Sequence, residues 1–478
     1  MATINIGSAD FIAILPIIIV SIFGVYLMLQ GVFAPRFHRM VLPYLALVGI
    51  LAALAGNFFL VGKFYTAFEG MVKVDHLTVM FNFIFLLTAA LCILLTQSYS
   101  EQEHIEFIEY IPLILFSTAG MMLMGSAESL MTIFLGLETM SIALYILAGF
   151  RRTNRYSLEA ALKYFLLGAF ATGFLLYGIA LLYGAVGSTN LAKVAEFFSK
   201  NNQQPGLLAL LGMGLIIIGF GFKVALVPFH MWTPDVYQGS PIPVTAFMAV
   251  GAKAAGFAAM LRVVTLAAAS ATFQWTEVLW ILAVLTMTVG NIIALVQDDI
   301  KRMLAYSSIA HAGYILIGVV AANDSTVAAV LFYLVIYLFM NLGAFAVAGL
   351  VSGKNERYVK IKYFSGLGRT QPMLALVMTI CMFSLAGFPP TGGFMGKFFL
   401  FKAALQSGYI WLVIFGAINT LISVYYYIRV VVAMYMQEPL EEQKVEPILP
   451  GAGLVLLVSL LGIFYLGIFP GTTLSILF

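Results

Sequence analysis

The sequence predicts an all-α membrane protein with about 14 transmembrane helices. The first observation is the composition, in which 62% of residues are hydrophobic and only 9% are charged, whereas soluble domains contain about 25% charged residues. The second is a mean hydropathy of +1.02. The third is the recurrence of apolar segments of about 20 residues, the length a helix needs to cross about 30 Å of hydrocarbon. No soluble domain is expected between these segments.

The expected spans follow one another along the whole chain. They cover residues 10–30, 41–62, 77–96, 110–125, 128–150, 159–185, 206–229, 243–268, 275–296, 303–321, 326–351, 373–407, 409–435 and 449–470. We expect the first run to be retained and not removed as a signal peptide. No Lys or Arg precedes it, and no persuasive small-residue cleavage site is present.

Two of the spans contain helix breakers close to a lysine. The seventh reads GFGFKVALVPFHMW, with Lys223 shortly before Pro228, and the twelfth reads SLAGFPPTGGFMGK, with Pro389 and Pro390 shortly before Lys397. Proline removes a backbone donor and clashes with the preceding turn, so the freed polar groups need partners within the protein or water. We therefore expect helices 7 and 12 to be broken.

The two broken segments also predict an internal symmetry. Inverted-repeat transporters place broken helices in corresponding positions of two halves, and an offset of about five spans turns the second copy over in the membrane. The sequence therefore predicts two inverted five-helix repeats, spans 4–8 and 9–13. The expected units are residues 1–109 with helices 1–3, residues 110–268 with helices 4–8, residues 269–435 with helices 9–13, and residues 436–478 with helix 14.

The distribution of basic residues predicts the orientation. With the N-terminus outside, the inner loops contain Arg36, Arg39, Arg151, Arg152, Arg155, Lys301, Arg302, Lys354, Arg357, Lys360, Lys362, Arg369 and Lys444. The outer loops keep only Lys63, Lys73, Lys193 and Lys200. The positive-inside rule then places both termini outside the cytoplasm. One inner loop is atypical, because it contains Glu101, Glu103, Glu106 and Glu109 without a basic residue. The cluster of Asp298, Asp299, Lys301 and Arg302 is expected to anchor the cytoplasmic surface.

Four ionisable side chains lie deep within the apolar spans, namely Glu138, Lys223, Lys253 and Lys397. A charge at the bilayer centre costs at least about 2.5 kcal/mol on insertion scales, so it is paired, neutralised or facing water, and it usually marks a proton or ion path. His311 lies deep in the tenth span near Ser307 and Ser308, and His230 lies at the end of the seventh. These six residues are the candidate proton relay.

Most of these candidates also have a structural interpretation. Lys223 and Lys397 could extend their ammonium groups toward the nearest membrane surface. Lys253 could be buried for packing among its small neighbours, and Glu138 could form a static ion pair with a lysine. His230 could be an interfacial hydrogen-bonding residue. The sequence alone leaves these alternatives open.

The remaining composition excludes several classes of chemistry. Only two cysteines are present, Cys92 and Cys381, so there is no C-x-x-C pair, iron–sulfur ligand set or disulfide framework. The five histidines are scattered, and no two share a helix face at metal-ligand spacing. No Walker A loop or dinucleotide fingerprint occurs. The chain is expected to hold no cofactor or metal of its own and to bind no nucleic acid.

The buried set predicts a mechanism for moving protons. Burial makes a lysine release its proton more readily, and a nearby carboxylate makes it retain the proton. If Glu138 moves away from Lys223, the proton on Lys223 becomes easier to lose. Lys253 and Lys397 could then pass it on through side chains and water. The energy would arrive as charge movement from a neighbouring subunit.

Several segments together resemble one family. The segments LGLETMSIALYILAGF, GFKVALVPFHMWTPDVYQGSPIPVTAF, AVGAKAAGFAAMLR, DDIKRMLAYSSIAHAGYILIG and AGFPPTGGFMGKFFLFKAAL are similar to the antiporter-like membrane subunits of respiratory complex I, the proton-translocating NADH-quinone oxidoreductase. The resemblance is strong from about residue 75 to residue 435. Within the family the chain is most similar to the N-type branch, because it stops soon after its last span and has a lysine at Lys397.

This resemblance implies roles and partners. Glu138 and Lys223 would form the controlling ion pair, Lys253 would be the central relay, and Lys397 would be the distal group from which protons leave. The chain would be an obligate hetero-oligomer member in a bacterial inner membrane, with both termini periplasmic. Its partners would be a neighbouring antiporter-like subunit, small membrane subunits, the lateral helix of a sister subunit and lipids. Flavin, iron–sulfur clusters and quinone would lie in partner subunits.

Two other hypotheses compete with this one. The chain could belong to a multisubunit Na⁺/H⁺ antiporter or a membrane-bound hydrogenase, which share the motif set. It could also be a stand-alone solute carrier, or a scaffold whose buried charges only hold helices together. The last hypothesis predicts that Lys253→Ala leaves proton pumping intact.

Overall fold

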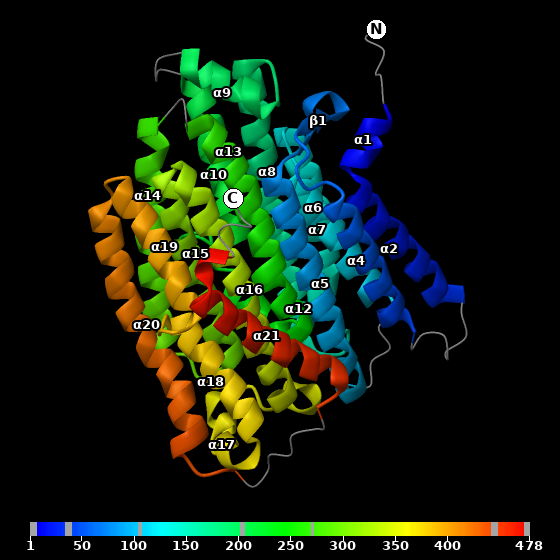
Figure 1. Ribbon diagram of the computed structural model, residues 1–478, viewed down its shortest axis with the longest axis vertical. Coiled ribbons are helices and arrows are strands. Elements are labelled where there is room, and N and C mark those ends of the chain that lie inside the picture. The colour runs from blue at the N-terminus through cyan, green and yellow to red at the C-terminus, as the bar shows by residue number, and fades with distance from the viewer. Residues whose placement is uncertain are drawn as a thin grey trace.

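The computed structural model describes residues 7–33, 41–103, 108–200, 206–268, 272–440 and 448–472. The sequence-based assignments for Arg36, His38, Arg39, His104, Glu106 and Lys444 lie outside these residues. Within them, 11 helices are long and apolar enough to cross a membrane, and three shorter apolar helices accompany them. The protein is thus a helical, multi-pass membrane protein (Figure 1). The total of 14 spans stays a prediction.

The N-terminal part packs at one end of the molecule (Figure 1). Its elements are α1 (Ser8–Ala13), α2 (Leu15–Phe33), α4 (Leu42–Phe58), β1 (Tyr65–Ala67), η1 (Phe68–Gly70), β2 (Val72–Val74) and α5 (His76–Glu103). The two short strands form an antiparallel pair in which Tyr65 lies opposite Val74.

The next part contains the first helix break. Its elements are α6 (Tyr110–Gly125), α7 (Leu130–Ala148), α8 (Arg155–Val186), α9 (Leu191–Lys200), α10 (Gly206–Val224), α11 (Thr233–Gly239), α12 (Ile242–Phe247), η2 (Met248–Ala252) and α13 (Lys253–Ala268). Helices α6 and α7 approach closely at two glycines, since a Cβ added to Gly120 would lie 2.7 Å from the carbonyl oxygen of Gly136. This contact fixes the helix on which Glu138 lies.

The last part contains the second break. Its elements are α14 (Thr272–Leu295), α15 (Ile300–Ala321), α16 (Asp324–Ser352), η3 (Lys354–Glu356), η4 (Ile361–Phe364), α17 (Leu367–Thr370), α18 (Pro372–Ala386), α19 (Gly392–Gln406), α20 (Ile410–Met436) and α21 (Pro450–Ile468). Helix α21 crosses the others obliquely (Figure 1) and contacts α5 and α16.

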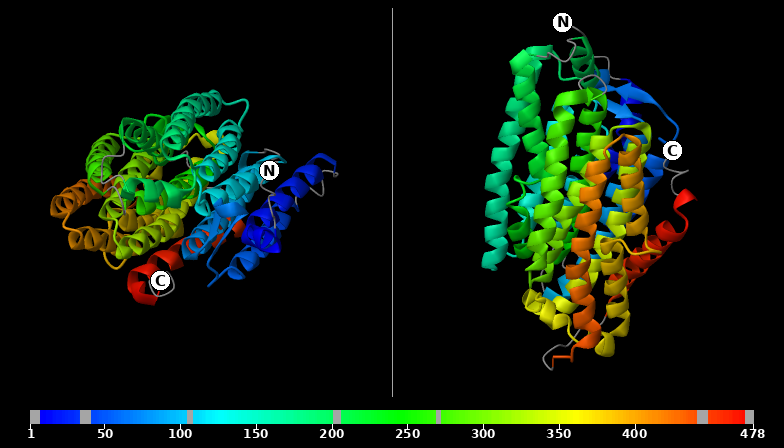
Figure 2. Two further views of the ribbon diagram at one scale, coloured as in Figure 1. Left: turned by 90° about the horizontal axis from the view of Figure 1, so that it is seen from above. Right: turned by 90° about the vertical axis from the view of Figure 1, so that its left-hand side faces the viewer.

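The helices differ in how deeply they are buried. The most apolar stretches of residues 242–264 and of α15 are completely buried, and that of α16 is 89% buried. The corresponding stretches of α2, α8, α20 and α21 are at most 33% buried and lie at the periphery. Figure 2 shows from above that the bundle is elongated, with α2 and α4 at one end and α20 at the other. The central helices are therefore shielded from lipid, and their polar side chains face other helices.

The structure can be compared with the predicted spans at three places. The seventh and twelfth expected spans are interrupted, since α10 ends at Val224 and α18 ends at Ala386. The prediction of broken helices at these positions is therefore confirmed. Between α8 and α10 lies the additional helix α9, which was not predicted. It buries Leu191, Val194 and Phe198, whose spacing is that of an amphipathic helix.

Candidate functional site

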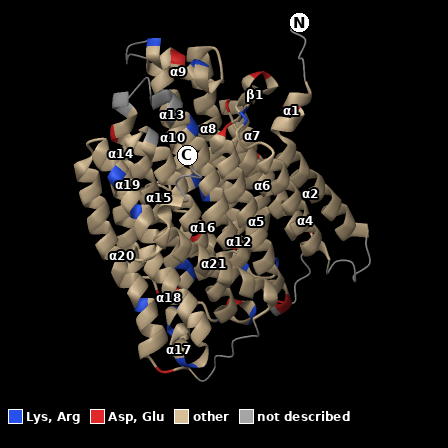
Figure 3. Cartoon of the chain, in the orientation of Figure 1, with Lys and Arg blue, Asp and Glu red and all other residues tan. Residues whose placement is uncertain are grey.

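Three lysines are almost completely buried in the helical bundle. Lys223 is 5% exposed, Lys253 is 2% exposed and Lys397 is 4% exposed. None of the ion pairs within 4.0 Å in the described part of the chain includes any of them. Most Lys, Arg, Asp and Glu residues instead lie toward the two ends of the molecule (Figure 3). The three ammonium groups must therefore be held by neutral oxygen atoms.

Lys223 lies in the last turn of α10, immediately before the first break. Its Nζ donates to Ser141 Oγ at 2.9 Å and to Tyr164 OH at 3.3 Å. The chain then turns at Ala225, whose φ of 62° is in the left-handed region. Such conformations are unfavourable for a residue with a side chain and cluster at functional sites. A small pocket beside Lys223 is lined in part by Ser141 and Tyr145.

Glu138 lies on α7, one helical turn before Ser141. It is partly exposed, and its Oε1 is buried without a hydrogen-bond partner. The carboxylate therefore lies close to the hydroxyl that holds Lys223, but the two charges do not form an ion pair in this structure. Whether Glu138 and Lys223 pair in another state of the protein stays a prediction.

Lys253 begins α13 directly after the π-helical turn η2. Its Nζ donates to both the carbonyl oxygen and the Oγ of Ser308 on α15. A π turn contains one residue more than an α turn and often marks a functional site. Here it precedes the central lysine.

His311 lies on α15 between two tyrosines. Its Nδ1 is 2.6 Å from Tyr333 OH on α16, and its Nε2 is 3.0 Å from Tyr427 OH on α20. The Tyr427 hydroxyl is also hydrogen-bonded to Ser307. The imidazole therefore belongs to a buried network of neutral groups that can both donate and accept protons.

Lys397 lies on α19, just after the second break. Its Nζ donates to the carbonyl oxygens of Leu385 at 3.1 Å and Ala386 at 3.0 Å. These carbonyls end α18 and have no partner within that helix, and a cation there interacts favourably with the helix dipole. The ammonium also lies 4.7 Å from the ring centroid of Tyr314 on α15.

The structure brings three of the six candidate relay residues together at one helix, α15. Lys253, His311 and Lys397 all meet α15, through Ser308, His311 itself and Tyr314. Ser307, His311 and Tyr314 are spaced as neighbours along one side of a helix. Helix α15 thus connects the central and distal lysines, whereas Lys223 and Glu138 lie together at α7 and α10.

His230 is placed differently. It lies in the break between α10 and α11 and is 8% exposed. Among the hydrogen bonds of the described residues, none joins its ring to the three lysines or to His311. Its role in a relay stays a prediction.

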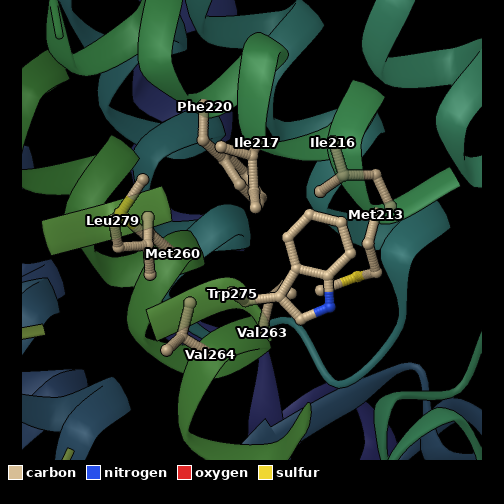
Figure 4. A pocket seen from close by; sticks show the side chains of 9 residues that line it. All are labelled: Met213, Ile216, Ile217, Phe220, Met260, Val263, Val264, Trp275 and Leu279. Carbon is tan, nitrogen blue, oxygen red and sulfur yellow. The ribbon is translucent and has the colours of Figure 1, made fainter. Parts of the chain in front are cut away.

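The hydroxyl partners Ser141, Tyr164, Tyr333 and Tyr427 were not predicted from the sequence. Each lies in a different span from the group that it binds, so sequence spacing provides no signal for the contact. A second pocket between α10, α13 and α14 is lined only by apolar side chains, including Met213, Phe220 and Trp275 (Figure 4). It contains no group that could transfer a proton. Among the described residues, no group of three or more His, Cys, Asp or Glu could hold a metal ion.

The fold and the buried groups together define a class of protein. It is a multi-pass membrane protein with titratable side chains joined through hydroxyl groups in its interior. The family described as NADH:quinone oxidoreductase/Mrp antiporter, transmembrane, matches residues 127–423. NADH-quinone oxidoreductase subunit N of Trichlorobacter lovleyi is 50% identical over 473 residues, covering 99% of this chain and 96% of that protein. The chain therefore belongs to the NADH-quinone oxidoreductase subunit N family.

Other relatives and solved structures agree. Subunit N 1 of Solibacter usitatus is 43% identical over 467 residues, covering 98% of this chain and 96% of that protein. A chain of respiratory complex I from Thermus thermophilus with bound aureothin has a TM-score of 0.83 at 37% identity, covering 96% of this chain and 98% of that one. A chain of the Mrp complex from Dietzia has a TM-score of 0.84 at 20% identity, covering 98% and 96%. That last likeness shows the fold alone.

Proposed function

We propose that this chain is a proton-translocating, non-redox membrane subunit of NADH-quinone oxidoreductase. The observation that supports this most strongly is the set of three buried lysines whose ammonium groups, among the described residues, donate hydrogen bonds only to neutral oxygens. A lysine without a carboxylate partner can lose its proton at modest cost, whereas one locked in an ion pair cannot. Quinone reduction elsewhere in the complex would then be coupled to proton transfer by a shift of charge near these lysines.

The geometry suggests how a proton passes through the interior. Movement of the Glu138 carboxylate toward Lys223 would hold that lysine charged, and its withdrawal would release the proton. A proton on Lys253 has the Ser308 hydroxyl as its first acceptor. Ser307 precedes Ser308 in the sequence. Its hydroxyl is hydrogen-bonded to Tyr427 OH, which is in turn hydrogen-bonded to the imidazole of His311. Water completes the steps that no described hydrogen bond spans, including the last one to Lys397.

Finer features of the assignment follow from the same proposal. Spans 4–8, residues 110–268, and spans 9–13, residues 269–435, form the two inverted repeats, flanked by residues 1–109 and 436–478. The subunit lies in a bacterial inner membrane with both termini periplasmic, consistent with the loop charges. Its partners are a neighbouring antiporter-like subunit, small membrane subunits, a sister subunit's lateral helix and lipids. Flavin, iron–sulfur clusters and quinone lie elsewhere in the complex.

Replacement of Lys253 tests the function directly. In membranes with the assembled complex, Lys253→Ala should abolish most NADH-driven proton pumping through this subunit, because the central exchangeable site is gone. Lys402→Ala is a matched control, since Lys402 is an exposed lysine on α19. Proton uptake and quinone reduction are measured at equal complex content. Normal pumping in Lys253→Ala would reject the relay in favour of a scaffold with structural charges.

A subunit of a Na⁺/H⁺ antiporter is not favoured. The Mrp complex chain matches at 20% identity, whereas subunit N of NADH-quinone oxidoreductase from four organisms, among them Trichlorobacter lovleyi and Solibacter usitatus, is 41–50% identical.

A further inference from the structure

A second set of buried charges lies outside the lysine relay. It consists of Glu103 at the end of α5, Arg151 between α7 and α8, Lys301 in the first turn of α15, and Glu356 in η3. We refer to these four residues as the inner-face cluster. Their side chains are at most 7% exposed, and the orientation inferred above places all four on the cytoplasmic side. Within the part of the chain that the structure describes, no hydrogen bond or ion pair joins these side chains to the candidate relay residues.

The cluster is organised around the carboxylate of Glu356. Lys301 Nζ lies 2.7 Å from its Oε2, and Arg151 lies 3.7 Å from its Oε1. Tyr99 OH donates to the same Oε1 at 2.6 Å, and Arg151 also pairs with Glu103 at 3.3 Å. Two carboxylates and two cations thus neutralise one another in a site almost closed to solvent.

The cluster holds the junction between α11 and α12 from both sides. The backbone N–H of Ile242, the first residue of α12, donates to Glu356 Oε1 at 3.0 Å. Lys301 Nζ donates to the carbonyl oxygens of Gln238 at 2.8 Å and Ser240 at 2.6 Å. A carboxylate is favourable at the start of a helix and a cation at the end of one. Glu356 and Lys301 therefore fix the chain where α11 ends and α12 begins.

Glu356 is held in an unusual backbone conformation. Its φ is 51°, and that of the preceding Asn355 is 61°. A residue with a long side chain adopts the left-handed region only when the surrounding contacts determine it. The strain indicates that the position of this carboxylate, and not only its charge, is specified by the fold.

The junction leads directly to Lys253. Helix α12 continues through the π turn η2 into α13, so Ile242 and Lys253 lie on one continuous rod, about 16 Å apart along its axis. This continuous helix is joined to α15 at two levels. Lys301 of α15 binds Ser240 before α12, and Ser308 of α15 binds Lys253, two turns further along. The inner-face contact therefore sets how α12 and α13 lie against α15.

The other end of this rod is also fixed. Arg262 on α13 donates to both carboxylate oxygens of Asp75, at 3.1 and 2.8 Å, and to the carbonyl oxygen of Gly125 at 2.6 Å. The rod that contains Lys253 is thus tied at both ends by charged contacts, with the π turn between them. Displacement of Lys253 requires a change within the rod or release of one tie.

We propose that Glu356 is a positioning residue for Lys253, which acts by fixing the start of α12 against α15. The proposal deepens the proton-translocation function and rests on it for its consequence. It assigns a role in coupling to a carboxylate whose contact, at Ile242, lies about 16 Å along the helix from Lys253. No hydrogen bond or ion pair of the described residues joins Glu356 to the six candidate relay residues. A structural charge pair alone would not need the contact with the Ile242 N–H.

The test separates the backbone contact from the ion pair. Glu356→Asp keeps the negative charge near Lys301 and Arg151, but its shorter side chain withdraws from Ile242. Exchanging the two charges, Lys301→Glu with Glu356→Lys, restores an ion pair but loses every backbone contact. Asp298→Asn is the control, because it removes a carboxylate that is 86% exposed on the same face. All variants are studied in the assembled complex.

Two measurements are made on each variant. Hydrogen exchange of the peptide covering residues 238–247 should accelerate about tenfold in Glu356→Asp and in the exchanged pair, because a charge-assisted hydrogen bond is lost. The protons pumped per NADH should fall in the same two variants and stay normal in Asp298→Asn. Exchange at the control level in Glu356→Asp would overturn the proposal, and so would faster exchange with unaltered pumping.

The exchange measurement also distinguishes this proposal from the function itself. It reports the contact between Glu356 and α12 whether or not Lys253 transfers protons. If Lys253→Ala pumps normally, the relay fails, and the exchange result still decides whether Glu356 holds the helix.

Discussion

Two groups of charged side chains in this protein are equally buried but have opposite kinds of partner. Lys301 and Arg151 of the inner-face cluster contact carboxylates at 2.7 to 3.7 Å. Lys223 and Lys253 contact only hydroxyl or carbonyl oxygens. An opposite charge favours the charged form of a buried group, while a group held by neutral dipoles changes its protonation state more readily. The partner, and not the burial, distinguishes a structural charge from an exchangeable one.

The largest expected effect is on assembly and concerns Lys301. Lys301→Met would leave Glu356 buried with less compensation, and removal of one partner of a buried pair costs about 3–5 kcal/mol. The amount of assembled complex on native gels should therefore drop severely. Lys253→Met leaves no carboxylate without its partner, so the complex with this variant should assemble normally but lose proton pumping. Equal amounts of assembled complex for the two variants would contradict the distinction between lysines paired with carboxylates and lysines held by neutral oxygens.

The next effect concerns the pair at α7 and α10. Glu138→Ala and Lys223→Ala should each lower both proton pumping and the quinone reductase rate without preventing assembly, since neither leaves an ion pair broken in this structure. Glu138→Asp should be milder, because the charge survives with a shorter reach. The rates are compared in membranes at matched complex content. Coupled activity at the normal level in either alanine variant would argue against a switching pair.

A carboxylate placed beside Lys253 should keep this lysine charged, as the carboxylates of the inner-face cluster do for Lys301. Ser308→Asp would put an anion next to the ammonium group and hold it in the charged form. Pumping should fall about tenfold or more although the lysine is present, since an opposite charge at this distance stabilises the charged form by at least that factor. Ser308→Asn, of similar size and neutral, is the control. Equal pumping in the Asp and Asn variants would show that the charge of the partner is irrelevant.

The smallest effect is a pH dependence at Glu103. Burial raises the pKa of this carboxyl, and the guanidinium of Arg151 only partly opposes the shift. A raised pKa in the folded protein means that the stability contribution is complete below the ordinary value of about 4.3 and is lost as the pH rises through the raised value. Glu103→Gln removes this buried charge and leaves Arg151 paired with Glu356 at 3.7 Å, so it should increase the inactivation temperature by about 1–2 °C at pH 8. The increase in inactivation temperature should become smaller toward pH 5. An increase that is the same at every pH would contradict a raised pKa of Glu103 as its cause.

The sequence predicted the positions of the lysines and the helix breaks well, because apolar runs and prolines act locally. Lys223 and Lys397 indeed flank interruptions at residues 225–232 and 387–391. The partners could not be predicted, since Ser141 and Tyr164 reach Lys223 from other helices. The expectation that Asp298, Asp299, Lys301 and Arg302 anchor the cytoplasmic surface stays a prediction, but the burial of Lys301 was not foreseen. Its side chain is 0% exposed, because Gln238 and Ser240 from one distant segment and Glu356 from another bind its ammonium group.

The atypical acidic loop after α5 has an explanation in the same contacts. Glu103 is neutralised by Arg151, which lies about 50 residues further along the chain, in the next loop that the charge distribution predicts to be cytoplasmic. Counting charges loop by loop cannot detect such a pair. The physical reason is that helix packing brings loops together whose order in the sequence is unrelated to their distance in space.

The π turn before Lys253 has a consequence for how far this side chain can move. Met248–Ala252 accommodates one surplus residue within a single turn. If that surplus were passed along the helix by one hydrogen-bond register, Lys253 would swing by about 100° around the axis. The swing would carry its amine away from Ser308 to another side of the rod, while both tied ends stayed in place. A single backbone rearrangement would thus break the contact between Lys253 and Ser308 without releasing either end of the helix.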